Sequence, residues 1–156
     1  MRKEDVGDEL TALAFDFFYW FSRFEFALKE NKILKNDNVG AKAQPGWTNF
    51  VKTWERAYSL SVSARVLYDA RPEQQIVAAK SELIWQSVNL GDCTSDLARV
   101  VRLLKTVRNN LFHGGKHGGA AWDDPVRTKL LLGASKSVLA ELAQLAGIEA
   151  DYCRYY

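Results

Sequence analysis

Hydrophobic residues recur at intervals of three and four along most of this chain, whereas strictly alternating hydrophobic and polar positions are rare. The interval of three and four is that of one face of an α-helix, so the pattern predicts a helical protein. The first helix is expected over about residues 5–35. A loop should follow over residues 36–46, because that stretch contains several residues that interrupt a helix, namely Asn38, Gly40, Pro45 and Gly46.

The middle of the chain predicts two further helices. One should begin at Trp47 or Thr48 and run to about Leu60, with apolar residues at helical spacing: Phe50, Val51, Trp54 and Tyr58. Residues 62–68 are ambiguous between helix and strand, and Pro72 then breaks the chain. Residues 73–88 are predicted to form the next helix, which would present Ile76, Leu83, Ile84 and Val88 on its apolar face.

Two helices with clear start and stop signals complete the pattern. Thr94 or Ser95 offers an N-cap, Asp96 suits the positive end of the helix dipole, and the paired glycines at 114–115 predict a stop after His113. The last helix should start at residues 123–125, where two aspartates precede a proline, and end before Gly147. A short aromatic tail remains over residues 148–156.

These elements predict an all-α fold, an up-and-down bundle of four to five helices that forms one domain over residues 1–156. A chain of 156 residues, 47% hydrophobic and 26% charged, is long enough to bury one core without disulfides or metals. Cys93 and Cys153 have no CxxC spacing, so free thiols in a reducing compartment are expected. The richest apolar stretch, 13–28, contains charged residues, and no secretory leader pattern opens the chain. A cytoplasmic protein without a membrane span is therefore predicted.

Charge changes this picture at one place. The formal net charge is only +2, yet residues 97–122 contain no Asp or Glu and carry five cations: Arg99, Arg102, Lys105, Arg108 and Lys116. Both histidines of the chain, His113 and His117, fall in the same stretch. Fixed cations beside an imidazole can position a phosphoryl group and move protons near pH 7, so an anionic partner such as a phosphate ester is predicted.

A helical wheel divides this fourth helix into two faces. One face should enter the core with Leu97, Val100, Leu104, Val107 and Leu111. The opposite face carries a polar stripe of Arg102, Thr106, Asn109 and His113, flanked by Lys105. Arg108 lies beside the apolar face, about 140° around the helix from His113. A second element must therefore bring their head groups together: either the arginine side chain reaches round to the rim, or an identical helix of a partner subunit lies alongside.

Arg108, the polar Asn109 directly after it, and His113 five positions beyond Arg108 resemble the R-x4-6-H motif of the HEPN superfamily (higher eukaryotes and prokaryotes nucleotide-binding domains). The motif stands at the expected end of a helix in an all-α chain of suitable length. The Asn-Leu-Phe-His-Gly-Gly-Lys continuation at 110–116 and the Arg-Phe-Glu-Phe-Ala-Leu-Lys segment at 23–29 are similar to those of prokaryotic stand-alone members. The fold resemblance covers most of the chain, and the motif covers under ten residues.

The resemblance implies a metal-independent endoribonuclease without a cofactor, working as a homodimer whose two motifs face each other. The ribose 2′-hydroxyl would attack the adjacent phosphate and leave a 2′,3′-cyclic phosphate and a 5′-hydroxyl. His113 would act as general acid or base, Arg108 would hold the phosphate oxygens, and Asn109 would orient the imidazole or the substrate. RNA-backbone contacts would come from Arg102, Lys105, Lys116 and His117.

One departure from the superfamily bears on regulation. Members that act as toxins beside nucleotidyltransferase antitoxins carry a modifiable tyrosine two positions after the histidine, and here that position is Gly115. Control through such a tyrosine is therefore not expected. A toxin or a phage-defence effector is predicted, with RNA, a second copy of the chain and a cognate antitoxin protein as candidate partners.

Structural alternatives stand beside each assignment. Arg108 can instead pair with a carboxylate such as Glu25, a role compatible with catalysis, and His113 can simply cap its helix. The cationic stripe can be a solvated face. The i, i+4 spacing of His113 and His117 suits a metal, but the intervening glycines and the absence of a following acid argue against one. The five tryptophans are expected in the core or an interface rather than as base-stacking platforms.

The alternative function is a non-catalytic helical module that binds a nucleotide or a partner protein through the same basic groove. Metal-free RNA cleavage that depends on Arg108 and His113 separates the two functions.

Overall fold

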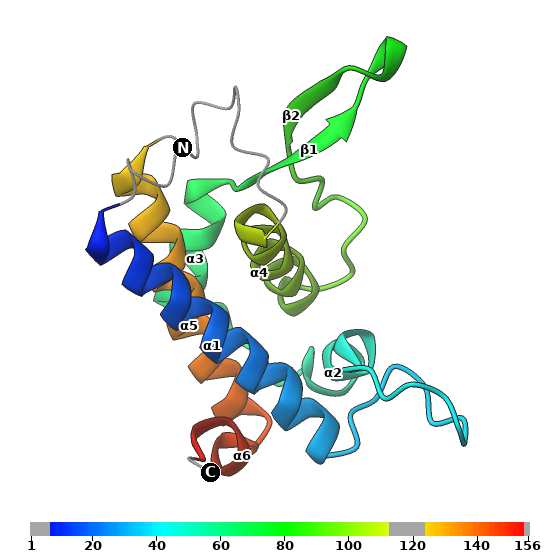
Figure 1. Ribbon diagram of the computed structural model, residues 1–156. Helices are drawn as coiled ribbons and strands as arrows, with labels where there is room; N and C mark the ends of the chain where they lie inside the picture. The colour runs from blue at the N-terminus through cyan, green and yellow to red at the C-terminus, as the bar shows by residue number, and fades with distance from the viewer. Residues whose placement is uncertain (1–6, 113–123, 155–156) are drawn as a thin grey trace.

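The computed structural model describes residues 7–112 and 124–154. Within these ranges the chain is mostly helical and carries one small antiparallel sheet of two strands (Figure 1). The elements follow in the order α1 (Asp8–Glu30), α2 (Trp47–Trp54), α3 (Val62–Ala70), β1 (Glu73–Val77), the 3-10 turn η2 (Ala79–Ser81), β2 (Leu83–Ser87), α4 (Asp96–Phe112), α5 (Pro125–Leu145) and α6 (Glu149–Cys153).

The two longest helices, α1 and α5, lie side by side, and their contact is the most extensive between any two elements (Figure 1). On α1, apolar residues at helical spacing bury completely or nearly so, namely Phe17, Phe21, Phe24 and Leu28. Two ion pairs, Lys129–Glu9 and Lys136–Asp16, join the exposed flanks of the pair. Helix α4 lies between this pair and the hairpin (Figure 1), so its position is set by the core on one side and by the hairpin on the other.

An aromatic cluster joins α1, α2 and α6 at one end of the core. Phe24 is fully buried; its ring stacks on Trp47 with centroids 5.0 Å apart and meets Phe50 edge to face at 5.5 Å. Tyr152 of α6 closes the cluster at 6.2 Å from Phe24. Because each ring contacts two or more others, this cluster fixes where α2 sits relative to α1.

Residues 73–88, predicted as a helix, form the β-hairpin instead, so the expectation of an all-α fold is wrong here. Strands β1 and β2 pair antiparallel, with Gln75 opposite Trp85. The turn between them uses Lys80 and Ser81 at positive φ, 57° and 62°, where Gly or Asn would have signalled a hairpin. The hairpin projects beyond the helices (Figure 1), and the side-chain amide of Asn110 on α4 ties it down by donating to the Glu73 carbonyl at 2.6 Å.

Other predicted boundaries shift by a few residues. The ambiguous segment 62–68 is helical as α3, whose Ser61 N-cap accepts from the Ala64 amide at 3.0 Å. Helix α1 ends at Glu30 rather than near residue 35, and α2 ends at Trp54 rather than near Leu60. The start of α5 is as predicted, because the Asp124 side chain caps it and proline follows. The tail contains the short helix α6, which the sequence did not predict.

Gly46 allows α2 to pack close to the chain that follows α1. Its amide donates to the Ile33 carbonyl at 2.8 Å, and a Cβ at this position would overlap the Leu34 carbonyl group. We expect Gly46→Ala to lower the free energy of unfolding by at least about 2 kcal/mol, because backbone atoms would have to move. Urea denaturation followed by circular dichroism measures this change.

Gly133 in the middle of α5 is the matched control for Gly46. A Cβ there would meet nothing within 4 Å, so Gly133→Ala should raise the free energy of unfolding by about 0.5–1 kcal/mol through helix propensity. Equal effects of the two substitutions would contradict the packing described for Gly46.

None of the helices within residues 7–112 and 124–154 combines the length and the apolar character needed to cross a bilayer.

Candidate functional site

Helix α4 presents the apolar face that its spacing predicted. Leu97, Val100, Leu104 and Val107 have no exposed surface, and Leu111 packs partly buried against the same core. The Ser95 hydroxyl accepts from the Ala98 amide at 3.2 Å, which confirms Ser95 as the residue that caps the helix. The cap sets where α4 begins, and the buried face sets the rotation of the helix, so that its opposite face points away from the core.

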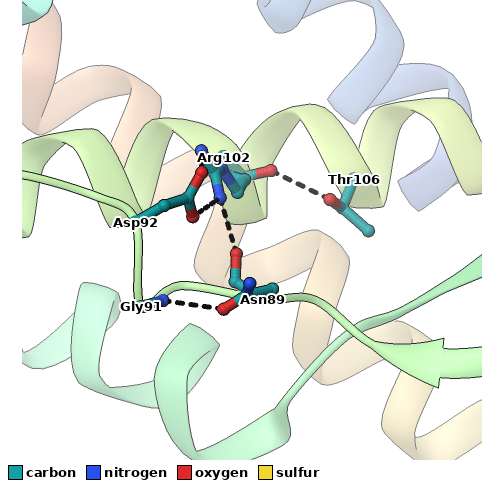
Figure 2. Close-up of polar contacts among 5 residues, drawn as sticks. All are labelled: Asn89, Gly91, Asp92, Arg102 and Thr106. Carbon is teal, nitrogen blue, oxygen red and sulfur yellow. Dashed lines mark hydrogen bonds and ion pairs between the residues drawn. The ribbon is translucent and has the colours of Figure 1, made fainter.

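The polar face of α4 is less positive than the acid-free sequence implied. The Arg102 guanidinium binds both carboxylate oxygens of Asp92, at 2.5 and 3.1 Å, and also donates to the Asn89 carbonyl at 2.6 Å (Figure 2). Arg99 pairs with Asp96 at 2.8 Å. Asp96 is the first residue of α4 and pairs with Arg99 one turn later, whereas Asp92 lies in the connection before the helix and is brought to Arg102 by the fold. Two of the five predicted cations are therefore already paired within the chain.

The Arg102–Asp92 contact holds the β2–α4 connection against α4. The hydrogen bond from Arg102 keeps the pKa of the Asp92 carboxyl below its usual range, and the same hydrogen bond raises the pKa of Arg102. Gly91 is the residue before Asp92, and its backbone N–H donates to the Asn89 side-chain oxygen at 2.9 Å (Figure 2). This hydrogen bond closes the turn that leads into Asp92. The pair lines this face of α4, and Arg102 is therefore not a free cation.

A groove of about 790 Å³ lies along this face of α4. Its walls are α2, the end of the hairpin with the β2–α4 connection, and the outer face of α4; we call it the α2–α4 groove. The groove is lined by three residues of the predicted polar stripe and by the lysine that flanks it: Arg102, Thr106, Asn109 and Lys105. Thr106 is 7% exposed and donates to the Arg102 carbonyl at 3.0 Å, so it belongs to the wall more than to the surface.

Arg108 lies on the α1 side of α4, next to the apolar face, as its wheel position predicted. Its guanidinium carbon stands 5.6 Å from the Phe21 ring centre and 5.2 Å from that of Phe112, within the range of cation–π contacts. One Nη atom donates to the Asn109 side-chain oxygen at 3.0 Å. Within the described part of the chain, Arg108 has no carboxylate partner.

The alternative pairing of Arg108 with Glu25 does not form. The Glu25 carboxylate accepts instead from the Trp47 indole N–H at 2.9 Å, and so it supports the aromatic cluster. Trp47 of α2 packs against Phe21 and Phe24 of α1, and from there its indole N–H reaches the Glu25 carboxylate. Glu25 therefore has a structural role within the described residues.

Exposed aromatic side chains begin at Phe112, one of the two rings that contact Arg108. Phe18 and Phe112 have ring centres 5.0 Å apart and are 40% and 48% exposed, and Phe15, one turn before Phe18 on α1, is 69% exposed. We call these three residues the aromatic patch. The spacing of Phe17, Phe21 and Phe24 by four and three residues was the sequence signal that separates these buried rings from the exposed Phe15 and Phe18.

Three candidates, His113, Lys116 and His117, lie outside the described residues. The structure thus brings together Arg108 and Asn109 of the candidate catalytic residues, and Arg102 and Lys105 of the candidate RNA-binding residues, on adjoining faces of one helix.

Tryptophans serve the core, as predicted. Trp47 is buried, and three others pack partly buried against the core: Trp20, Trp54 and Trp85. Trp122 lies outside the described residues. Cys93, buried in the wall of the α2–α4 groove, and the exposed Cys153 are free thiols. Over residues 7–112 and 124–154, no cluster of three or more His, Cys, Asp or Glu side chains is arranged to hold a metal ion.

Comparison of the chain with protein-family models, with curated proteins and with solved structures yields no match.

Proposed function

We propose that this protein is a metal-independent endoribonuclease of the HEPN type, with Arg108, Asn109 and His113 at its reaction centre. The observation that carries the proposal is the state of Arg108. It is a half-buried guanidinium at the end of α4, held by two aromatic rings and one amide oxygen, with no carboxylate partner among the described residues. An arginine oriented in this way keeps N–H donors for an incoming anion.

The proposed chemistry needs only proton transfer and charge stabilisation. The 2′-oxygen of a ribose attacks the neighbouring phosphorus while a general base takes its proton. The bond from phosphorus to the 5′-oxygen of the next nucleotide breaks, and a general acid protonates that oxygen. The products are a 2′,3′-cyclic phosphate and a 5′-hydroxyl, and no water or metal enters the step. His113 is the proton-transfer group because an imidazole titrates near neutral pH.

Arg108 would stabilise the charge on the phosphate, and Asn109 would position the reacting groups. The guanidinium of Arg108 would bind the non-bridging oxygens as negative charge grows on the phosphorus centre. The Asn109 side-chain oxygen already accepts from Arg108, which leaves its amide N–H groups free for the substrate or for the imidazole. Asn109 would therefore link the arginine to the histidine one turn later.

The reaction centre would be shared by two copies of the chain. Arg108 lies over Phe21, and a residue five positions further along a straight helix would project about 140° away from it, so one copy of α4 would not by itself bring an imidazole to this guanidinium. A second copy related by a two-fold axis would bring its own histidine to this arginine. The aromatic patch of Phe15, Phe18 and Phe112 supports this arrangement, because exposed phenylalanines beside a site are typical of a protein interface.

A cellular role as a toxin or a phage-defence effector fits an enzyme that cuts RNA without a cofactor. Gly115 replaces the tyrosine that antitoxin nucleotidyltransferases modify in one branch of the superfamily. A cognate antitoxin would therefore act by covering the site rather than by modifying that residue. The up-and-down bundle of that superfamily is likewise part of the proposal, with the hairpin as an addition to it.

One observation favours the second candidate, a non-catalytic module that binds a nucleotide or a protein. The α2–α4 groove is large enough for a small ligand and lies beside, not at, Arg108. A binding module would use the groove and leave RNA intact.

Incubation of the purified protein with RNA in EDTA tests the proposal. The wild type should cut, with 2′,3′-cyclic phosphate and 5′-hydroxyl ends, and His113→Ala should lose the activity. Cutting that persists unchanged in His113→Ala, or that stops with EDTA alone, would overturn the proposal. Intact RNA with both proteins would leave the binding module as the function.

A further inference from the structure

The α2–α4 groove has a lining suited to one nucleotide. Its volume of about 790 Å³ falls within the roughly 300–1,000 Å³ of small-molecule sites. Aliphatic side chains contributed by α2, the end of the hairpin and α4 provide an apolar surface against which a base can lie: Val51, Val88, Ala98 and Val101. A cavity of this volume has room for one nucleotide and not for a base-paired duplex.

Two lysines face this groove from opposite walls, Lys52 on α2 and Lys105 on α4. Both are exposed, and neither forms an ion pair with any carboxylate of the described residues. Two ammonium groups on opposite walls are suited to the phosphates on either side of a bound nucleotide. The carboxylates of the lining are Glu55 and Asp92, and Asp92 is already occupied by Arg102. Glu55 is then available as an acceptor for a base amino group.

Asn109 connects the groove to the proposed reaction centre. It lines the groove and also accepts the hydrogen bond from Arg108. A strand whose scissile phosphate lies at Arg108 therefore reaches the groove within one nucleotide. On the same face of α4, Arg102 is joined to the β2–α4 connection through Asp92 and the Asn89 carbonyl (Figure 2).

We propose that the α2–α4 groove is a nucleotide subsite that binds one unpaired nucleotide of single-stranded RNA next to the scissile phosphate, with Lys52 and Lys105 on its flanking phosphates. The proposal deepens the proposed ribonuclease function and rests on it for the position of the scissile bond. Because an unpaired base must enter the groove, the substrate class is single-stranded RNA, and double-stranded RNA is excluded.

The test uses a fluorescent 2′-O-methyl RNA oligonucleotide, which has no free 2′-hydroxyl and so cannot be cut, and measures its binding by anisotropy at several salt concentrations. The double variant Lys52→Gln/Lys105→Gln should bind about tenfold more weakly at physiological salt. The slope of the logarithm of its binding constant against the logarithm of salt concentration should be shallower by roughly 0.7 per lost phosphate contact. Lys80→Gln, at the exposed tip of the hairpin, is the matched control and should bind like the wild type.

Asp92→Asn gives a test in the opposite direction. Without the carboxylate, Arg102 becomes an additional free cation in the groove, so the affinity for the RNA probe should increase. The slope of the logarithm of the binding constant against the logarithm of salt concentration should become steeper by roughly 0.7. Circular dichroism confirms that each variant is folded before its affinity is compared.

Two outcomes would overturn the subsite: unchanged affinity in the double variant, or equal affinity for a duplex of the same sequence. If Arg108-dependent and His113-dependent cleavage is present in that case, the ribonuclease function stands and the subsite alone fails. If no variant or wild type cuts RNA, yet binding of the probe still requires Lys52 and Lys105, the subsite stands and the ribonuclease function fails.

Discussion

Arg108→Ala should reduce the rate of RNA cleavage by about 10²–10³-fold or more, because it removes the donors that meet the charge developing on the phosphate. The loss should appear in kcat rather than in the affinity for uncleavable RNA, since the guanidinium is needed most in the transition state. Arg108→Lys should remain strongly impaired, because an ammonium cannot give the paired N–H donors of a guanidinium. Single-turnover cleavage of a defined RNA measures both variants.

Arg65→Ala is the matched control, since Arg65 is an exposed arginine on α3. It should cut at the wild-type rate. Loss of activity in Arg65→Ala equal to that in Arg108→Ala would assign the effect to net charge and would contradict a specific role for Arg108.

Phe24→Ala should lower the free energy of unfolding by about 3–5 kcal/mol, a large part of the stability of a domain of this size. Phe24 has no exposed surface and contacts Trp47, Phe50 and Tyr152, so its removal leaves a cavity where three helices meet. Urea denaturation measures the change. Because α2 forms one wall of the α2–α4 groove, RNA binding should weaken as well.

Val62→Ala provides the comparison, because Val62 is 81% exposed on α3. Its effect should stay within about 0.5 kcal/mol. A small effect of Phe24→Ala, close to that of Val62→Ala, would show that the aromatic cluster is not what holds α2 against α1.

The sequence predicted those parts of the fold in which local signals and burial agree. On α4 the apolar spacing, the Ser95 cap and Asp96 in the first turn all point to the same helix, and its core face is confirmed. On α5 the Asp124-Pro125 pair marks the start for a purely local reason. The position of Arg108 beside the apolar face also followed from helix geometry alone.

The hairpin could not be predicted in this way. Apolar residues such as Ile76 and Ile84 suit a helix face as well as a strand, and the turn places Lys80 and Ser81 at positive φ without a glycine. The strands are held by pairing with each other and by Asn110 of α4, which is 37 residues from Glu73. Tertiary contacts of this kind leave no local signal.

The candidate site was predicted in its residue types and only partly in its partners. Arg102 was expected as a free cation, but Asp92 pairs with it across the β2–α4 connection. Glu25 was one carboxylate considered as an alternative partner for Arg108, but it accepts a hydrogen bond from Trp47. Both differences arise because the sequence shows which charges exist and the fold decides which of them meet.

Complementation between two inactive variants tests the central claim, that the guanidinium of one copy and the imidazole of another act on the same phosphate. Arg108→Ala and His113→Ala, each inactive alone, are mixed and allowed to exchange subunits. The account predicts that the mixture regains on the order of a quarter of the wild-type rate, because about half of the dimers are mixed and each holds one intact site. A mixture that forms mixed dimers and still leaves the RNA uncut would contradict it.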